Sequence, residues 1–376
     1  MSHRNMSVSI HFLTILVALF IARASCRALL WHPENRTALF VFGDSLFDPG
    51  NNNFLNTTSQ YQANFYPYGE TFFKHPTGRF SDGRIIPDFI AEYAGLPLIP
   101  PYLQPGKYEF MGGANFASAG AGALAETHSG FVVDLKSQLR QFEKIEKQLK
   151  KNFGDELAAK TISEAVYMFS IGGNDYGSPF FTNSTLFQSH SHEQYVAMVI
   201  GNLTSVISGI HSKGGRKFGV NSLGPLGCHP VMRALEGTGA CSKELNELVK
   251  LHNGALAKAL QKLGAKLDGF KYSNCDLFSV VMELIDNPPK YGFKEGKEAC
   301  CGSGPYRGRT SCGGRRGETE YKLCPNPSEH IYFDSSHPPE KANQYYAELM
   351  WSGSINVTGP YNLEELFKPI HRQTKN

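Results

Sequence analysis

Three residues of this sequence, Ser45, Asp334 and His337, are of the kinds that together perform nucleophilic catalysis. A serine hydroxyl attacks well only beside a base of near-neutral pKa, and that base needs a carboxylate on its other nitrogen to fix its tautomer. Asp334 and His337 are three residues apart in the segment FDSSHP, before a helix that we expect to begin at Pro338. One tight turn could therefore bring acid and histidine together. Each residue alone is more often structural, so the prediction rests on the combination.

Ester chemistry also needs donors for the oxygen that becomes negative when a carbonyl is attacked. The segment GGND supplies Asn174, whose side-chain amide is a donor, and the segment GANF supplies Gly113, whose backbone N–H is another. Taken singly, both segments are typical of turns, since Gly and Asn punctuate loops in most proteins.

The pattern of apolar residues predicts the strands and helices around these side chains. Short apolar runs at 38–42, 165–171 and 217–220 each end near glycine, which predicts strands buried on both faces of a parallel sheet. Between and after them, apolar residues recur at three- and four-residue spacing over 135–149, 196–210, a segment after Ser242 and a segment after Pro338 and Pro339. This alternation predicts one α/β domain whose ligands bind beyond the carboxyl ends of the strands. The stretches 66–129 and 287–328 are expected to be long loops.

The first residues resemble a secretory leader. An apolar run over 10–22 is followed by Ala22-Arg23-Ala24, which predicts cleavage near Ala24 and divides the chain into a signal peptide at 1–24 and a single domain at 25–376. A membrane anchor is the alternative, but it needs about 20 apolar residues and this run is shorter. No later run is expected to span a membrane. The mature protein is therefore predicted to be soluble and without a transmembrane anchor.

Composition excludes some function classes. The chain has 37 basic and 34 acidic residues, a net charge of only +3, and no run of like charges, so no nucleic acid partner is expected. Export would make glycosylation possible at five sequons. They begin at Asn35, Asn56, Asn183, Asn202 and Asn356.

Eight cysteines in an exported chain indicate disulfides. Cys26 lies next to the expected cleavage site, and if it is removed with the leader, seven cysteines remain and one of them must be a free thiol. Cys228 and Cys241 bracket a Gly- and Pro-containing loop and are the best single pair. A zinc site is the alternative for the last four cysteines, but their spacing lacks the C-x2-C pairs that zinc sites favour, so we expect no metal.

Four motifs in this order resemble the GDSL esterase/lipase branch of the SGNH hydrolases, and the plant subfamily in particular. They are FVFGDSLFDPGNNN, GANFASAGAG, GGND and DSSHP. Further plant hallmarks are YPYGETFFKHPTGRFSDGR, SLGPLGCHP and YGFKEGKEACCG, so the resemblance covers residues 38–352. The stretches TGRFSDGRIIPDFIAEYAGLPLIPPYLQP and LKSQLRQFEKIEKQL are most similar to GDSL lipases linked to defence and specialised metabolism.

The resemblance implies a three-layer α/β/α, flavodoxin-like parallel sheet without metal or cofactor. It assigns Ser45 as the nucleophile, His337 as the base and Asp334 as the residue that orients the base. The oxyanion hole would comprise the N–H groups of Ser45 and Gly113 and the amide of Asn174, with Gly112 able to replace Gly113 if the loop register differs. Phe333 and Pro339 stand where many plant members have Trp and Thr, which would reshape the pocket wall.

The expected function is a secreted carboxylic ester hydrolase, extracellular (apoplastic) or vacuolar, that acts on lipid or specialised-metabolite esters. An acyltransferase that passes the same acyl-enzyme to an alcohol is the main alternative. A non-catalytic binding module and an enzyme of carbohydrate acetyl groups are two others. The chain has no G-x-S-x-G elbow, no HExxH and no phosphate-binding or dinucleotide motif, which argues against α/β-hydrolases, zincins and nucleotide-dependent enzymes.

Overall fold

A six-stranded sheet forms the centre of the computed structural model, which describes residues 37–182 and 184–369. The strand order is β2-β1-β3-β4-β5-β8, of which the first five run parallel and β8 pairs antiparallel with β5. The order of the five parallel strands is that of flavodoxin-like sheets. Their bounds are β1 (Leu39–Gly43), β2 (Gly113–Asn115), β3 (Val166–Ser170), β4 (Lys217–Val220), β5 (Lys271–Cys275) and β8 (Thr358–Pro360).

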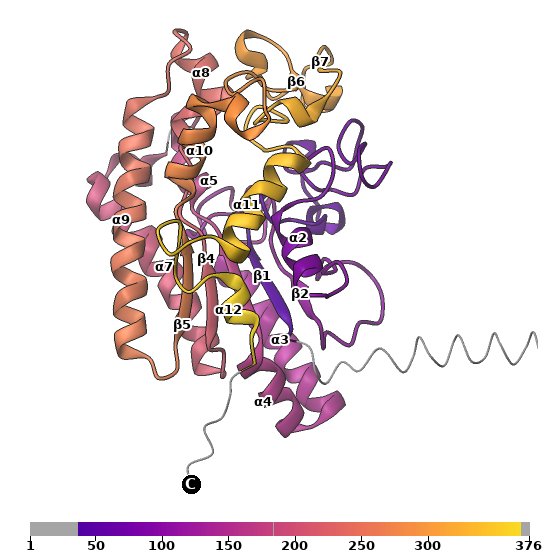
Figure 1. Cartoon of the computed structure of the whole chain (residues 1–376), viewed down its shortest axis with the longest axis vertical. Helices are drawn as coiled ribbons and strands as arrows, with labels where there is room; N and C mark the ends of the chain where they lie inside the picture. The colour runs from indigo at the N-terminus through magenta and orange to yellow at the C-terminus, as the bar shows by residue number, and fades with distance from the viewer. Residues whose placement is uncertain (1–36, 183, 370–376) are drawn as a thin grey trace, which may run out of the picture. The chain divides into compact units, whose positions relative to one another are not determined.

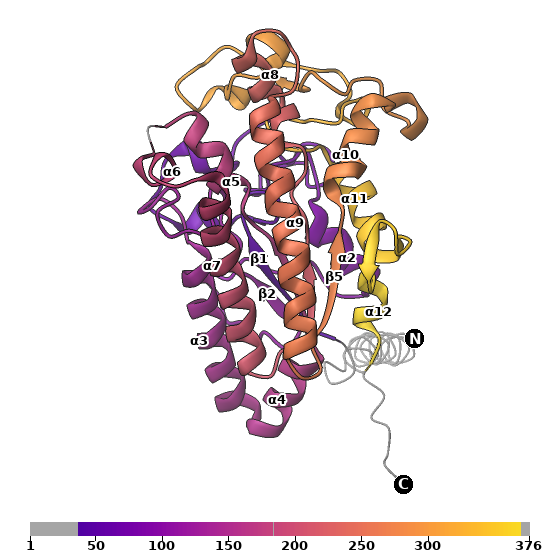
Figure 2. The same cartoon turned by 90° about the vertical axis from the view of Figure 1, so that its left-hand side faces the viewer.

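Helices cover both faces of the sheet (Figures 1 and 2). One layer consists of α3 (Leu135–Phe153), α7 (His192–Ser212) and α9 (Lys243–Lys266), which face the viewer in Figure 2. The other consists of α2 (Ile86–Tyr93), α10 (Leu277–Asp286), α11 (Glu340–Ser352) and α12 (Leu363–Phe367). Shorter helices are α4 (Asp155–Glu164), α5 (Gly173–Gly177), α6 (Thr185–Gln188) and α8 (Pro230–Glu236). The three-layer α/β/α expectation is confirmed.

Strand β1 shows why two layers are needed. All five of its residues are buried, and side chains alternate between the faces of a strand. Phe40 and Phe42 join the core cluster beneath α3, α7 and α9, while Leu39 and Val41 join the cluster beneath α2, α10 and α11. A strand that is apolar on both faces can be buried only between two layers.

The long helices lie where periodicity predicted them, with one difference at α11. This helix begins at Glu340, two residues after Pro338, and Pro339 is its extended N-cap. Pro338 cannot be helical because a residue that precedes a proline is pushed out of the α region.

Helix α7 contradicts the expectation that no run after the leader could span a membrane, because it is long and apolar enough by length and composition. Its buried side chains, such as Val199, Leu203 and Ile207, belong to the core cluster around the sheet. Burial in a core accounts for the same composition.

The two expected loops contain structure that the sequence analysis missed. The stretch 66–129 includes α2 and the edge strand β2. The stretch 287–328 contains the two-residue strands β6 (Cys301–Gly302) and β7 (Lys322–Leu323), which lie at the same end as α8 in Figure 1. Single-turn 3₁₀ helices connect many segments: η2 (Asn51–Phe54), η3 (Ser59–Tyr61), η4 (Ser178–Phe180), η5 (Leu226–Cys228), η6 (Pro288–Tyr291), η7 (Pro305–Arg307), η8 (Cys312–Gly314) and η9 (Pro327–Glu329).

Three disulfides are present in the described part of the chain. They join Cys228 to Cys241, the pair that the sequence analysis singled out, and also Cys300 to Cys324 and Cys301 to Cys312. Cys275 is a buried free thiol.

Several expectations lie outside the described residues. They concern the leader and its cleavage site, Cys26, Asn35 and Asn183. Of the other sequon residues, Asn56, Asn202 and Asn356 are exposed.

Candidate active site

A sharp turn after β1 carries Ser45 to the carboxyl edge of the sheet. Gly43 has a φ of 155°, and a Cβ there would lie 2.4 Å from the carbonyl oxygen of Ser170, so only glycine allows this exit. The Asp44 N–H donates to that same oxygen, and the Asp44 carboxylate accepts the N–H of Leu46. The backbone N–H of Ser45 makes no hydrogen bond with any described residue.

Ser45, His337 and Asp334 lie in hydrogen-bond contact. His337 Nε2 is 2.8 Å from Ser45 Oγ, and His337 Nδ1 is 2.7 Å from Asp334 Oδ1. The turn that holds the acid and the histidine is closed by their own backbone, since Asp334 Oδ1 also accepts the N–H groups of Ser336 and His337. Three residues of spacing are therefore sufficient for this contact.

The Asp334 carboxylate is buried, and several protein groups donate hydrogen bonds to it. Burial acts to raise its pKa, but His337, Arg316 and the hydroxyl of Tyr68 outweigh burial and hold the pKa well below its usual range. Asp334 is therefore an anion at any physiological pH. A permanent anion at Nδ1 fixes the proton there and leaves Nε2 free to accept the proton of Ser45.

Two neighbouring titratable groups have pKa values shifted mainly by burial. Burial raises the pKa of Asp44 to about 7. His229, which lines the same cavity, has its pKa lowered by burial to about 4 and is therefore a neutral imidazole at neutral pH.

Asn174 lies at the same cavity as Ser45, on the first turn of α5. Its Nδ2 donates one hydrogen to the carbonyl oxygen of Ala121 at 2.9 Å, which leaves the second amide hydrogen for a ligand. The neighbouring Asp175 is buried and accepts the N–H groups of Ala123 and Leu124, so α5 is tied to the loop that follows β2.

The structure does not bring Gly113 to this cavity. Gly113 pairs with Leu39 at the start of β1, whereas Ser45 follows the other end of that strand. Its N–H already donates to the carbonyl oxygen of Phe110 at 3.0 Å. Gly112 lies before Gly113 and is also absent from the cavity wall, so exchanging the two does not rescue the assignment.

Gly120, which was not among the predicted donors, offers a backbone N–H group at this cavity. It lines the cavity, has a φ of +85°, and its N–H has no acceptor among residues 37–182 and 184–369. His128 Nδ1 lies 2.8 Å from the Gly120 carbonyl oxygen. The SAGAG motif after β2 could have predicted this donor, because ligand-binding groups lie after the carboxyl ends of parallel strands and not before the strands.

The motif DPGNNN holds this second loop beside Ser45. Asp48 Oδ2 accepts the N–H of Ala119, and Asn52 Nδ2 donates to the carbonyl oxygen of the same residue. Asn51 Nδ2 binds the carbonyl oxygens of Asn115 and Ala117. The asparagines thus satisfy backbone carbonyl groups at the end of β2 and in the buried loop that follows it.

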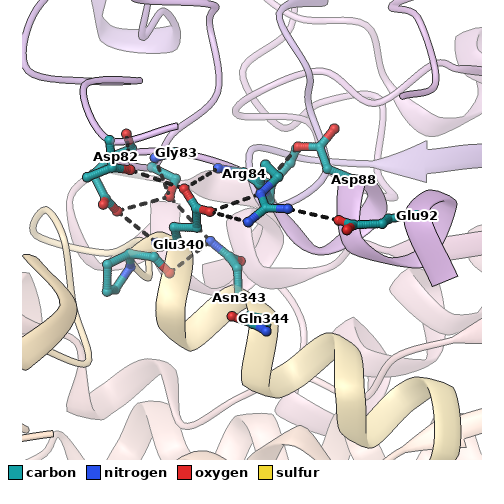
Figure 3. A network of polar contacts seen from close by, with 12 residues as sticks. Asp82, Gly83, Arg84, Asp88, Glu92, Glu340, Asn343 and Gln344 are labelled. Atoms are coloured by element: carbon teal, nitrogen blue, oxygen red, sulfur yellow. Dashed lines mark hydrogen bonds and ion pairs between the residues drawn. The ribbon is translucent and has the colours of Figure 1, made fainter. Parts of the chain in front are cut away.

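A second polar network fixes the start of α11, directly after His337 (Figure 3). Glu340 Oε1 accepts from Arg84 Nε at 2.9 Å and from Nη2 at 2.7 Å, and the Glu340 N–H donates to Asp82 at 2.7 Å. Arg84 also pairs with Glu92 of α2 at 2.8 Å. This network therefore ties the turn that carries His337 to α2.

The cavity beside Ser45 has a volume of about 540 Å³. Apart from the edge that carries Ser45 and His337, its walls are mostly apolar, and one side of them comes from α8, α9, α10 and the loop after β4. These wall residues include Leu223, Leu226, Met232, Leu245, Leu277 and Val281. No group of three or more metal-ligating side chains occurs in the described residues.

Comparisons with known proteins agree with one another. Residues 39–350 match the family described as GDSL-like Lipase/Acylhydrolase. The chain is 51% identical over 366 residues to GDSL esterase/lipase 1 of Arabidopsis thaliana, covering 96% of this chain and 98% of that protein. It is 52% identical to the GDSL lipase of Tanacetum cinerariifolium, covering 89% of each. It is 48% identical to GDSL esterase/lipase 4 of Arabidopsis thaliana, covering 98% and 99%.

Proposed function

The chain belongs to the GDSL-like lipase/acylhydrolase family and is an esterase/lipase of the plant GDSL type, and from this premise we propose that it works through Ser45, His337 and Asp334. The observation that carries the proposal is the 2.8 Å contact between Ser45 Oγ and His337 Nε2, with Asp334 on the opposite ring nitrogen. A serine with a base at this distance is the arrangement that nucleophilic catalysis requires.

In the proposed reaction, His337 takes the proton of Ser45 as Oγ bonds to the ester carbonyl carbon. The carbonyl oxygen becomes an anion, which the N–H groups of Ser45 and Gly120 and the amide of Asn174 stabilise. His337 then gives its proton to the departing alcohol, and an acyl-enzyme remains. Water attacks that ester with the same histidine as base, and the carboxylic acid leaves while Ser45 regains its proton.

We propose esters of apolar acyl groups as substrates, from lipids or specialised metabolites. The apolar cavity wall supports this proposal, because apolar surface removed from water contributes roughly 25 cal/mol per Å² to binding. The relatives named lipase are consistent with it. The leader pattern and the three disulfides support export to the extracellular space or the vacuole.

Transfer of the acyl group to an alcohol is a second possibility that one observation favours. An open cavity of about 350 Å³ adjoins the first and shares Gln60, Phe181 and Arg316 with it. This space could hold an acceptor beside the acyl-enzyme. Incubation with an ester and a series of alcohols, followed by analysis for new ester against free acid, distinguishes the two outcomes.

The proposal is tested with a fluorophosphonate probe and a short p-nitrophenyl ester on purified protein. We expect the probe to label the unchanged protein, and Ser45→Ala and His337→Ala to abolish both labelling and hydrolysis. Ser212→Ala is the matched control, because Ser212 is an exposed serine at the end of α7 that does not line the cavity, and it should keep both. Hydrolysis by a correctly folded Ser45→Ala protein would overturn the assignment.

A further inference from the structure

Arg316 reaches towards the catalytic acid from a distant loop. It lies between Cys312 and Cys324, in the disulfide-bonded region. Its guanidinium donates from Nε to the carbonyl oxygen of Ser59 at 3.1 Å and from Nη2 to that of Gln62 at 2.6 Å. With these two bonds the planar group has a fixed orientation, because both acceptors belong to the backbone.

The third bond of Arg316 goes to Tyr68, whose side chain is fully buried. Arg316 Nη1 donates to the Tyr68 hydroxyl oxygen at 2.8 Å, and that hydroxyl lies 2.7 Å from Asp334 Oδ2. A guanidinium can only donate, and a phenol has one hydrogen. The Tyr68 hydroxyl must therefore donate its proton to Asp334. The hydrogen-bond chain from Arg316 through Tyr68 to Asp334 thus has a single direction.

Aromatic rings pack around Arg316 and Tyr68 and keep them in place. Arg316 lies over the rings of Phe65, Tyr68 and Phe80, at 5.0, 5.1 and 5.3 Å from their centroids. Phe333 packs edge-on against Tyr68. Aromatic faces attract a cation and exclude water, which strengthens each polar contact between them.

Two adjacent cysteines hold both ends of this hydrogen-bond chain, Arg316 at one end and Asp334 at the other. Cys300 and Cys301 form the disulfides to Cys324 and Cys312, on either side of Arg316. Their own N–H groups donate to the carbonyl oxygens of the two residues before Asp334, at 2.9 and 2.7 Å. The disulfides therefore set the position of Arg316 relative to the catalytic acid.

We propose that Arg316 is a positioning residue that acts through Tyr68 on Asp334, holding the carboxylate in the orientation and charge that His337 needs. The inference rests on the proposed function of Ser45, His337 and Asp334. Oδ2 is within reach of both Tyr68 and His337 Nδ1, at 2.7 and 2.9 Å, so loss of the phenol bond would free the carboxylate to rotate.

The sign of the expected pH effect follows from the charges around His337. Asp44 and Asp334 are acidic groups near the imidazole, His229 is a neutral neighbour, and Arg233 is a more distant cation that acts on His229. Arg316 partly offsets the negative charge of Asp334. Its removal would favour the imidazolium, so the base would become available only at higher pH.

The test compares the pH dependence of kcat/KM for a short p-nitrophenyl ester in several variants. For Arg316→Gln we expect the acidic limb of the kcat/KM profile, where activity falls at low pH, to shift to higher pH. The expected shift is about half to one pH unit, because one nearby positive charge is lost. We expect kcat to fall roughly 10-fold, far less than the about 10⁴-fold loss when an orienting Asp is replaced. Tyr68→Phe should shift the limb in the same direction. The loss in kcat of the double variant should be smaller than the product of the losses of the two single variants.

Two control variants separate positioning from folding. Arg316→Lys keeps the charge and should keep the position of the acidic limb even if kcat falls. Arg315→Gln removes the same charge from the adjacent, exposed residue and should change nothing. Thermal unfolding of each variant shows whether lost activity is lost fold, since only the folded fraction enters kcat.

The outcomes separate the two proposals. An unmoved acidic limb in folded Arg316→Gln would overturn the positioning role while leaving the triad intact. Failure of the unchanged protein to react with a fluorophosphonate at Ser45 would overturn the proposed function itself. A shift in the limb that Arg315→Gln reproduces would show a general charge effect and would also reject the role of Arg316.

Discussion

At the scale of single residues, the site is defined by the donors that the fold leaves unpaired. Nearly all buried backbone groups in proteins have hydrogen-bond partners, so an unpaired N–H group at a cavity is available to bind a ligand. The N–H groups of Ser45 and Gly120 meet this condition, and that of Gly113 does not. The spare amide hydrogen of Asn174 adds a third donor beside them.

Asn174→Ala should lower kcat by roughly 10²- to 10³-fold with a small change in KM, because an oxyanion donor acts mainly in the transition state. Steady-state kinetics on the p-nitrophenyl ester measure the effect. The amide also holds Ala121, so thermal unfolding must be measured alongside. A folded variant with normal kcat would remove Asn174 from the oxyanion hole.

Gly113→Ala should destabilise the fold without changing the chemistry of the folded fraction. A Cβ there would lie 1.8 Å from the Leu39 carbonyl oxygen, and its φ of +110° strains any other residue. We expect a loss of at least about 2 kcal/mol in the free energy of unfolding. Urea denaturation measures it, with Gly112→Ala as the control, since a Cβ there meets nothing within 4 Å. A stable but inactive Gly113→Ala would instead restore Gly113 to the catalytic site.

At the scale of elements, the segments that carry Ser45 and His337 are held by side chains that bind neighbouring segments. The asparagines after β1 hold the loop after β2, and Glu340 at the start of α11 binds the segment before α2. Side-chain hydrogen bonds therefore add to the backbone pairing that holds these segments. The apparent loop regions of the sequence are therefore held in place by specific hydrogen bonds.

Glu340→Gln should weaken the connection between α11 and α2. The variant loses the charge-assisted bonds from Arg84, whose side chain and that of Glu340 are 19% and 16% exposed. We expect a loss of about 1–2 kcal/mol in the free energy of unfolding, which is typical for hydrogen bonds to charged groups. Glu348→Gln, on an exposed position of the same helix, is the control. Equal stability of the two variants would contradict a structural role for the network.

At the scale of the whole molecule, the two helical layers bury several acids whose pKa values rise as a result. Burial raises the pKa of Asp44 to about 7 and those of Asp48, Asp82 and Asp175 to about 6. A group with a raised pKa binds protons more tightly when folded than when unfolded. Its contribution to stability therefore decreases as pH rises between the ordinary value near 4 and the raised value.

Asp44→Asn isolates one of these groups. We expect the stability of the variant relative to the unchanged protein to increase as pH rises from about 4 to 7, by up to about 1.4 kcal/mol per pH unit. Urea denaturation at several pH values measures this difference. Asp286→Asn, at an exposed position, should show no such trend. A pH-independent difference for Asp44→Asn would show that its carboxyl group is ionised throughout.

The layers of the fold and the three residues of the proposed triad could be predicted from the amino-acid sequence alone. Strands that are apolar on both faces and helices with repeating apolar residues are local patterns, and local patterns survive folding when burial agrees with them. Asp334 and His337 were also predictable as a pair, because three residues on one turn bring them into contact whatever surrounds them.

The groups that complete the proposed site could be identified only from the three-dimensional structure. Gly113 and Gly120 lie in the same motif, and they differ in whether the N–H is already used, which depends on neighbours far along the chain. Arg316 meets Tyr68 across 248 residues, a contact that no spacing in the sequence predicts. Patterns along a chain specify local geometry, whereas an unpaired donor or a distant cation depends on the three-dimensional arrangement of the whole chain.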